Sequence, residues 1–133
     1  MREILFRGKD NGVLNNQWQL GSADCTNEEF PQIIRYDRFG NKMYISVDKE
    51  TLGQFTGLTD KNGKKIFEGD ILSTENGTFS NTGMGHILFY KGMWTSFYGQ
   101  DALGRDCFDE LHTVCNSREV IGNIHDNPEL LEG

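Results

Sequence analysis

The chain has 133 residues and a formal net charge of −7, with 13 Lys and Arg against 20 Asp and Glu. Nine Phe, four Tyr and two Trp supply enough apolar surface for a packed core, which excludes wholesale disorder, and sixteen Gly with two Pro favour short strands over helices. The acidic balance disfavours nonspecific nucleic-acid binding, because a duplex-binding surface needs several cations near phosphates and the densest basic cluster (Lys61, Lys64 and Lys65) lies in a predicted turn.

No stretch approaches the roughly 18 consecutive apolar residues of a membrane-spanning helix, so we expect no membrane association. Residues 1–8 lack the apolar region and cleavage site of a signal peptide, which predicts that the chain stays in the cell that makes it. Cys25, Cys107 and Cys115 are an odd number of cysteines without the spacing of a disulfide framework. They favour reduced intracellular thiols.

In the N-terminal part, short apolar runs alternate with turn residues. The expected elements are a strand at 4–7, a turn at 9–12, a strand at 18–20, a loop at 22–31, a hairpin of 33–36 with 43–47, and a helical turn at 49–51. The hairpin rests on period-two patterning, since Met43, Ile45 and Val47 share one face. Asp48 is expected to cap the helical turn.

The remainder of the chain continues the pattern of short strands and turns. The expected elements are a strand at 54–56, a turn at 60–63, a strand at 71–72, a hairpin signal at 76–77, a hairpin of 86–90 with 93–98, a strand at 120–124 and a helix start at 127–128. Gly69 permits a bend, and Asp70 can accept hydrogen bonds from nearby backbone amides. Residues 99–117 lack firm periodicity. The pattern predicts a mainly β fold with minor helix.

Three segments carry a family resemblance: the opening at residues 2–8, the block at 54–72 and the tail at 119–131. The block contains Phe-Thr-Gly-Leu-Thr-Asp-Lys-Asn-Gly-Lys-Lys-Ile-Phe-Glu-Gly-Asp, and the tail contains Ile-Gly-Asn-Ile and Asn-Pro-Glu-Leu-Leu. Together they resemble the YopX family, whose members occur in phages and prophages.

The resemblance implies a C-terminal SH3-like small β-barrel and a smaller N-terminal β-rich part, and it implies no activity. It places an N-terminal β-rich subdomain at residues 1–52 and the barrel subdomain, with a short C-terminal helix, at residues 53–133. It also implies a phage or prophage accessory protein in the cytoplasm of a bacterial host cell.

Cys107, His112 and Cys115 offer three metal ligands within nine residues. Structural zinc sites present paired Cys or His at short spacing with a fourth ligand, which Cys25 or His125 would have to supply from afar. Ordinary thiols in a reduced cytosol explain the cysteines more simply. We therefore predict no metal site and no cofactor.

Titratable side chains that could perform acid–base chemistry are scattered along the chain. His86, His112 and His125 are possible general bases, but none stands in a nucleophile motif. Glu68 and Asp70, with Asp60, could suggest acid chemistry or Mg²⁺ binding, although a glycine bend and turn-stabilising bonds account for them more simply. We predict no catalytic residues.

Four aromatic residues raise the alternative of a stacking surface for bases or peptides, which the strand pattern assigns mainly to the core. They are Trp18, Trp94, Phe97 and Tyr98.

Three functional hypotheses follow. The first is a non-enzymatic protein that acts through protein–protein contacts or self-assembly as a homo-oligomer, since small barrels leave strand edges that can pair with another copy. The second is an acidic inhibitor or decoy of a nucleic-acid-handling host enzyme, which rests on net charge. The third is a metal-dependent hydrolase that uses Glu68, Asp70 and His125.

Overall fold

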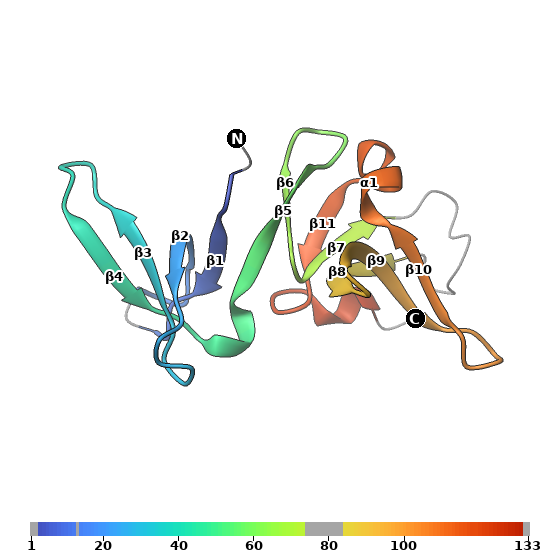
Figure 1. Cartoon of the computed structure of the whole chain (residues 1–133), viewed down its shortest axis with the longest axis horizontal. Helices are drawn as coiled ribbons and strands as arrows, with labels where there is room; N and C mark the ends of the chain where they lie inside the picture. Colours follow the sequence, from blue (N-terminus) through green and yellow to red (C-terminus); the bar gives the residue numbers. More distant parts are fainter. Residues whose placement is uncertain (1–2, 13, 74–83, 132–133) are drawn as a thin grey trace. The chain divides into compact units, whose positions relative to one another are not determined.

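A computed structural model describes residues 3–12, 14–73 and 84–131 and shows a mainly β chain with two antiparallel sheets (Figure 1). The predicted mainly β class with minor helix is confirmed. The chain divides into two compact units, Met1–Phe55 and Thr56–Gly133, which are described separately.

The first unit is built from hairpins. Its elements are β1 (Phe6–Lys9), β2 (Trp18–Asp24), β3 (Gln32–Tyr36), β4 (Lys42–Ser46), the 3₁₀ helix η1 (Lys49–Thr51) and the start of β5 (Gly53–Thr59). The six-stranded sheet has the order β4-β3-β2-β1-β5-β6, so β4 forms one edge. β2 is longer than predicted, because Ser22, Ala23 and Asp24 pair with β3 although their sequence is too polar to suggest a strand.

Buried β-branched residues hold the first unit together. Ile33 of β3 lies opposite Ile45 of β4, and both are buried, as is Val47. Val47 packs against the backbone of Gly8, where a Cβ atom would lie 2.8 Å from Val47 Cγ2. Glycine is therefore required at position 8 for this close approach.

The predicted side-chain cap of η1 is wrong. The structure shows no side-chain capping bond from Asp48. The Thr51 hydroxyl instead donates to the Asp48 carbonyl oxygen at 2.7 Å and accepts from the Lys9 amide at 2.9 Å. The threonine side chain thus joins the turn to β1.

The second unit is a curved antiparallel meander. Its elements are the rest of β5, β6 (Lys65–Phe67), β7 (Asp70–Ser73), β8 (Met84–Tyr90), β9 (Met93–Gln100), β10 (Asp106–Glu110), α1 (Leu111–Val114), the 3₁₀ helix η2 (Cys115–Ser117), β11 (Val120–Asn123) and the 3₁₀ helix η3 (Pro128–Leu131). The five-stranded sheet has the order β10-β9-β8-β7-β11. The predicted two-residue turn between β8 and β9 is present, with positive φ at Lys91 and Gly92.

A closed barrel is not confirmed for the second unit. In the described ranges no pairing joins β10 to β11, so the five-stranded sheet is open. β10 falls in residues 99–117, where no strand was predicted, and a register shift between Cys107 and Phe108 interrupts its pairing with β9. The hairpin signal at residues 76–77 lies outside the described residues.

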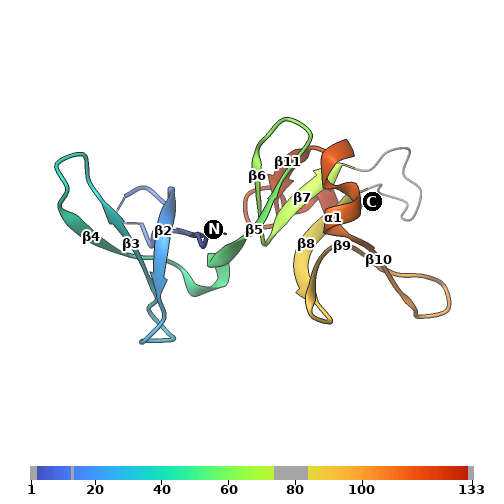
Figure 2. The same cartoon turned by 45° about the horizontal axis from the view of Figure 1, so that its top comes forward.

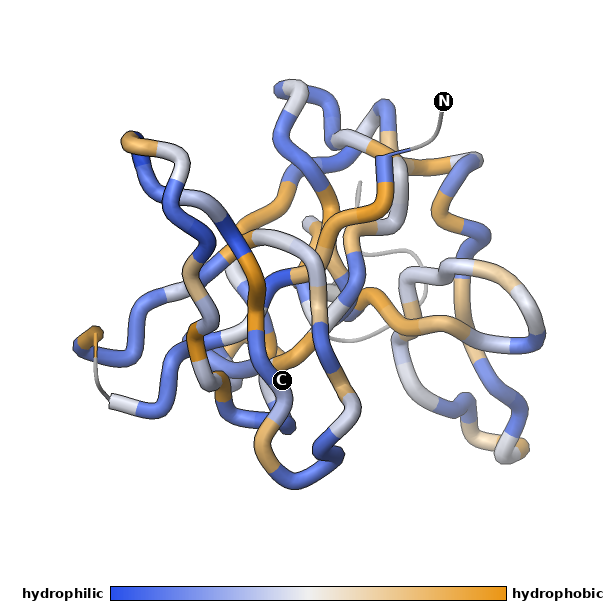
Figure 3. Tube along the Cα trace, turned by 60° about the vertical axis from the view of Figure 1, so that its left-hand side comes forward, coloured by the Kyte–Doolittle hydropathy of each residue, from blue (hydrophilic) through white to orange (hydrophobic). Residues whose placement is uncertain are grey.

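The core of the second unit joins β6, β7, β8, α1, η2 and β11. Its buried residues are Ile66, Leu72, Ile87, Leu111, Cys115 and Val120, with Leu58 and Trp94 packed against them. Figure 3 shows apolar and polar residues alternating along much of the trace. None of the helices in the described ranges is long and apolar enough to cross a membrane.

Three hairpin turns repeat one local design. Asp37, Asp60 and Asp101 each begin a five-residue turn whose fourth residue is a glycine with positive φ. In each, the aspartate Oδ1 accepts hydrogen bonds from the backbone amides two and four residues later, at 2.8–2.9 Å. The carboxylate satisfies amides that the tight turn leaves without a strand partner.

Candidate functional site

The hairpin of β3 and β4, drawn in Figures 1 and 2, has one buried and one exposed face. The buried face carries Ile33 opposite Ile45. On the other face Ile34 lies opposite Tyr44, and Tyr36 lies opposite Lys42. Because partners in an antiparallel pair project to the same side, these four residues line one outward surface.

Of the four exposed aromatic residues in the described part of the first unit, three lie on this hairpin and its tip, and the fourth, Phe30, lies in the loop before β3. Tyr36 is 64% exposed, Tyr44 is 55% exposed, and Phe39 in the turn between β3 and β4 is 76% exposed. Large aromatic side chains gain much from burial, so their exposure on one hairpin makes this surface the candidate contact site. We call Tyr36, Phe39 and Tyr44 the aromatic patch.

Cations lie over the aromatic patch. The guanidinium of Arg38 is 5.0 Å from the centroid of the Phe39 ring, and the Lys42 ammonium is 5.4 Å from that of Tyr44. A hydrogen bond to Tyr44, together with the charges of Tyr44 and Tyr36, raises the pKa of Lys42. With Arg35, residues 32–46 carry three cations and one carboxylate, so the hairpin is basic in an acidic chain.

The hairpin also presents an open strand edge. β4 pairs with β3 on one side and ends the order of its sheet. The Val47 amide donates to the Pro31 carbonyl oxygen at 3.1 Å, and the Asp37 amide donates to that of Asn41 at 2.9 Å. These bonds place odd-numbered residues in the hydrogen-bonded positions of the ladder, so the backbone N–H and C=O of Tyr44 point to the open edge.

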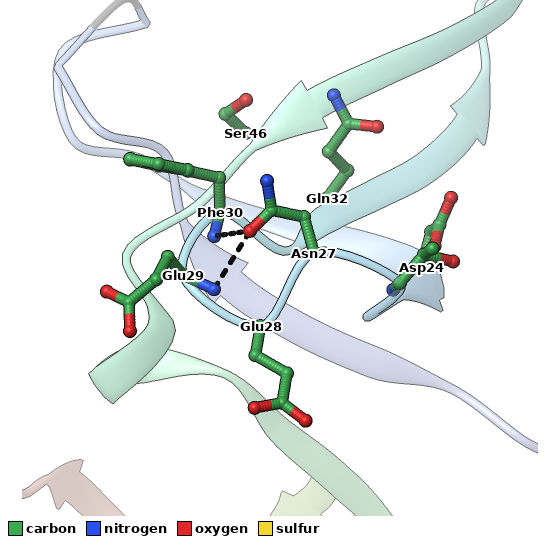
Figure 4. A pocket seen from close by; sticks show the side chains of 8 residues that line it. Asp24, Asn27, Glu28, Glu29, Phe30, Gln32 and Ser46 are labelled. Carbon is green, nitrogen blue, oxygen red and sulfur yellow. Dashed lines mark hydrogen bonds between the residues drawn. The ribbon is translucent and has the colours of Figure 1, made fainter.

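A shallow pocket lies beside this hairpin, in the loop between β2 and β3 (Figure 4). Asn27 Oδ1 accepts from the amides of Glu29 and Phe30, at 3.1 and 3.3 Å, which fixes the loop. The Glu28 and Glu29 carboxylates point away from each other, and that of Glu29 pairs with Lys49 at 3.0 Å. The acidic side chains therefore do not converge on one point of this pocket.

The Cys and His residues considered as metal ligands lie in different settings. Cys107 is half-buried on β10, whereas Cys115 is buried in the core of the second unit. His112 is exposed on α1, with Nε2 3.6 Å from the Glu110 carboxylate. Across residues 3–12, 14–73 and 84–131, no three His, Cys, Asp or Glu side chains gather as a metal site would require.

The carboxylates considered for acid chemistry mainly shape the backbone. Asp70 is 2% exposed, and its Oδ2 accepts from the Phe67 amide at 2.7 Å, as predicted for a turn-stabilising residue. The adjacent Gly69 has a φ of +89°, and the ring of His125 lies against it, 3.6 Å from where a Cβ would stand. His125 thus reaches the bend, while one Asp70 oxygen is already bonded to the backbone.

The remaining sequence candidates have local roles. The turn lysines Lys61, Lys64 and Lys65 are exposed, and Lys61 lies 3.7 Å from the Glu119 carboxylate. Burial lowers the pKa of His86, which favours its neutral form on β8. Among the aromatic residues, Trp94 packs against the core of the second unit.

Asp10 is a buried carboxylate that no sequence motif marks. Its two oxygens accept from the backbone amides of Gly12, Leu14, Asn16 and Gln17 at 2.8–3.2 Å. Burial favours the neutral acid, but the four hydrogen bonds outweigh it and lower the pKa of Asp10. The residue organises the loop before β2.

A polar network in the second unit was also missed. The Asp109 carboxylate accepts from the Tyr98 hydroxyl at 2.6 Å and from Arg118 Nη2 at 2.9 Å, while Arg118 Nη1 donates to the Tyr98 oxygen. Burial and the bond to Asp109 raise the pKa of Tyr98. Arg118 is 7% exposed. The network links β9 and β10 to Arg118, which lies between η2 and β11, so its role is structural.

Fold and surface together define an antiparallel two-sheet β protein with an aromatic, basic edge hairpin. A family model described as YopX protein matches residues 6–132, so the chain belongs to the YopX family. The structure is similar to the crystal structure of protein EF1440 from Enterococcus faecalis, with 25% identity, a TM-score of 0.54, and coverage of 98% of this chain and 99% of that chain. Among curated proteins, no similar sequence was found.

Proposed function

We propose that this YopX-family chain is a non-enzymatic binding protein whose β3–β4 hairpin contacts a protein partner. The observation that carries the proposal is the aromatic patch, in which Tyr36, Phe39 and Tyr44 are more than half exposed on an edge hairpin. Aromatic residues and arginine are enriched in protein interfaces and dominate their binding energy. The open edge of β4 adds backbone groups that a partner strand can pair with.

The use of the buried carboxylates supports a binding role over an enzymatic one. Asp10, Asp60 and Asp70 accept backbone hydrogen bonds that hold turns and bends. Acid–base catalysis needs a carboxyl group whose oxygens reach a substrate, and these oxygens serve the fold.

Several finer expectations belong to the same proposal. The strand order β10-β9-β8-β7-β11, with a helical turn between β10 and β11, supports an SH3-like barrel in the second unit. Membership of the YopX family supports a phage or prophage origin and action in the cytoplasm of a bacterial cell. The net charge of −7 supports a protein partner over nucleic acid.

The test is affinity capture from a bacterial lysate with the tagged wild-type chain and a variant that combines Tyr36→Ser, Phe39→Ser and Tyr44→Ser. These side chains are exposed, so we expect the variant to fold but to lose the partners that the wild type retains. Phe89→Ser is the matched control, because Phe89 is 57% exposed on β8, outside the hairpin. Equal capture by all three chains would refute the role of the hairpin.

A further inference from the structure

Within the described residues, a second sheet edge is open, and its charge is opposite to that of β4. β10 ends the order of the five-stranded sheet, as β4 ends that of the six-stranded sheet. Each of the two strands has five residues. Open edges are templates for pairing with another strand.

The β10 edge is acidic. Asp106 and Glu110 are exposed at the two ends of β10, and Asp109 between them forms an ion pair with Arg118. A hydrogen bond from the Tyr90 hydroxyl, supported by one from Gln100, lowers the pKa of Asp106, so this carboxylate is ionised at neutral pH. An acidic edge on one molecule therefore complements the basic edge hairpin on another.

The two edges also match residue by residue. We propose, on the basis of the hairpin's binding role, that β4 of one molecule pairs antiparallel with β10 of a second copy. With the strands aligned end to end, Lys42 stands opposite Glu110, and Tyr44 stands opposite the half-buried Phe108. Opposite charges and aromatic pairs are the cross-strand partners that stabilise antiparallel ladders. Every described pairing in both sheets is antiparallel, which favours this direction.

The contact uses two different surfaces of the chain, so it is heterologous. Each molecule offers both a β4 edge and a β10 edge, and association need not stop at two copies. The same contact can therefore be tested by reversing a charge on β4 or a charge on β10.

The test uses sedimentation velocity on the full chain over a wide range of concentrations. We expect the wild type to self-associate, and Lys42→Glu and Glu110→Lys each to weaken association about tenfold, because each places like charges opposite one another. Mixing the two variants should restore association, since every contact between them joins opposite charges. The double variant should associate as the wild type does.

Circular dichroism on all variants checks the fold, and Lys64→Glu, an exposed charge reversal in the β5–β6 turn, is the control expected to leave association unchanged. A wild type that stays monomeric overturns the proposal, as do single variants that associate normally or a mixture that does not recover.

Binding of a single-stranded oligonucleotide that Lys42→Glu abolishes and the double variant does not regain would identify a nucleic acid as the occupant instead. Partner capture that depends on the aromatic patch while the chain stays monomeric would refute self-pairing and leave the proposed function standing.

Discussion

Replacing Asp109 with alanine is expected to lower the free energy of unfolding by about 3 kcal/mol, the low end of the range for breaking a buried ion pair. The side chain of Arg118 is 9% exposed, and that of Asp109 is 19% exposed. Without the carboxylate, the Arg118 guanidinium keeps its buried charge and loses its counter-ion, and the Tyr98 hydroxyl loses its acceptor. Chemical denaturation measures the change.

The control is the exposed ion pair of Arg105 with Asp101, where the arginine side chain is 72% exposed. Arg105→Ala should lower the free energy of unfolding by at most about 1 kcal/mol, which is the usual contribution of a surface ion pair. Replacing both partners of the buried pair, with Asp109→Leu and Arg118→Met, should cost less than Asp109→Ala alone. Equal losses for the buried and the exposed pair would contradict this role for the network.

Replacing Asp60 with alanine is expected to lower the free energy of unfolding by about 2–3 kcal/mol. Like its counterparts in the other two turns, Asp60 holds its own turn, but its Oδ2 also accepts from the Val120 amide at 2.9 Å. The variant leaves that buried amide of β11 without its acceptor. Asp101→Ala is the matched control, because its turn has the same backbone bonds, and thermal denaturation should show a smaller loss there.

The charge of Asp60 should make stability depend on pH. Burial raises its pKa, but hydrogen bonds from the amides of Val120, Lys64 and Asn62 outweigh that effect and hold the pKa below its ordinary value in the folded chain. The resulting stabilisation is present above the unfolded pKa and is lost as the pH falls through the lower folded value. Asp60→Asn should therefore reduce the fall in melting temperature between neutral and acidic pH. An unchanged fall would show that this charge does not contribute.

Hairpins with apolar alternation were the most predictable part of the fold. The runs that became β3 with β4 and β8 with β9 alternate strictly and flank short turns, so local sequence suffices to pair them. The strand β10 was not predicted, because Asp106, Asp109 and Glu110 make its sequence polar. Its pairing with β9 depends on tertiary contacts such as the bond from Tyr98 to Asp109.

The repeated turn is visible in the sequence once its spacing is known. Asp37, Asp60 and Asp101 are each followed three residues later by glycine, a spacing typical of a turn capped by a carboxylate. The exposure of the aromatic patch was harder to predict from the sequence. The sequence shows that Tyr36 and Tyr44 belong to strands, but exposure depends on which face the rest of the unit covers.

Pairing of the open edge of β4 with a strand of a second copy can be measured residue by residue through amide hydrogen exchange. The Tyr44 amide points to the open edge, so its exchange should slow as the protein concentration rises. The Lys64 amide, already bonded to Asp60 within its own turn, should exchange at the same rate throughout. A Tyr44 amide that exchanges equally fast at every concentration would contradict strand pairing at this edge.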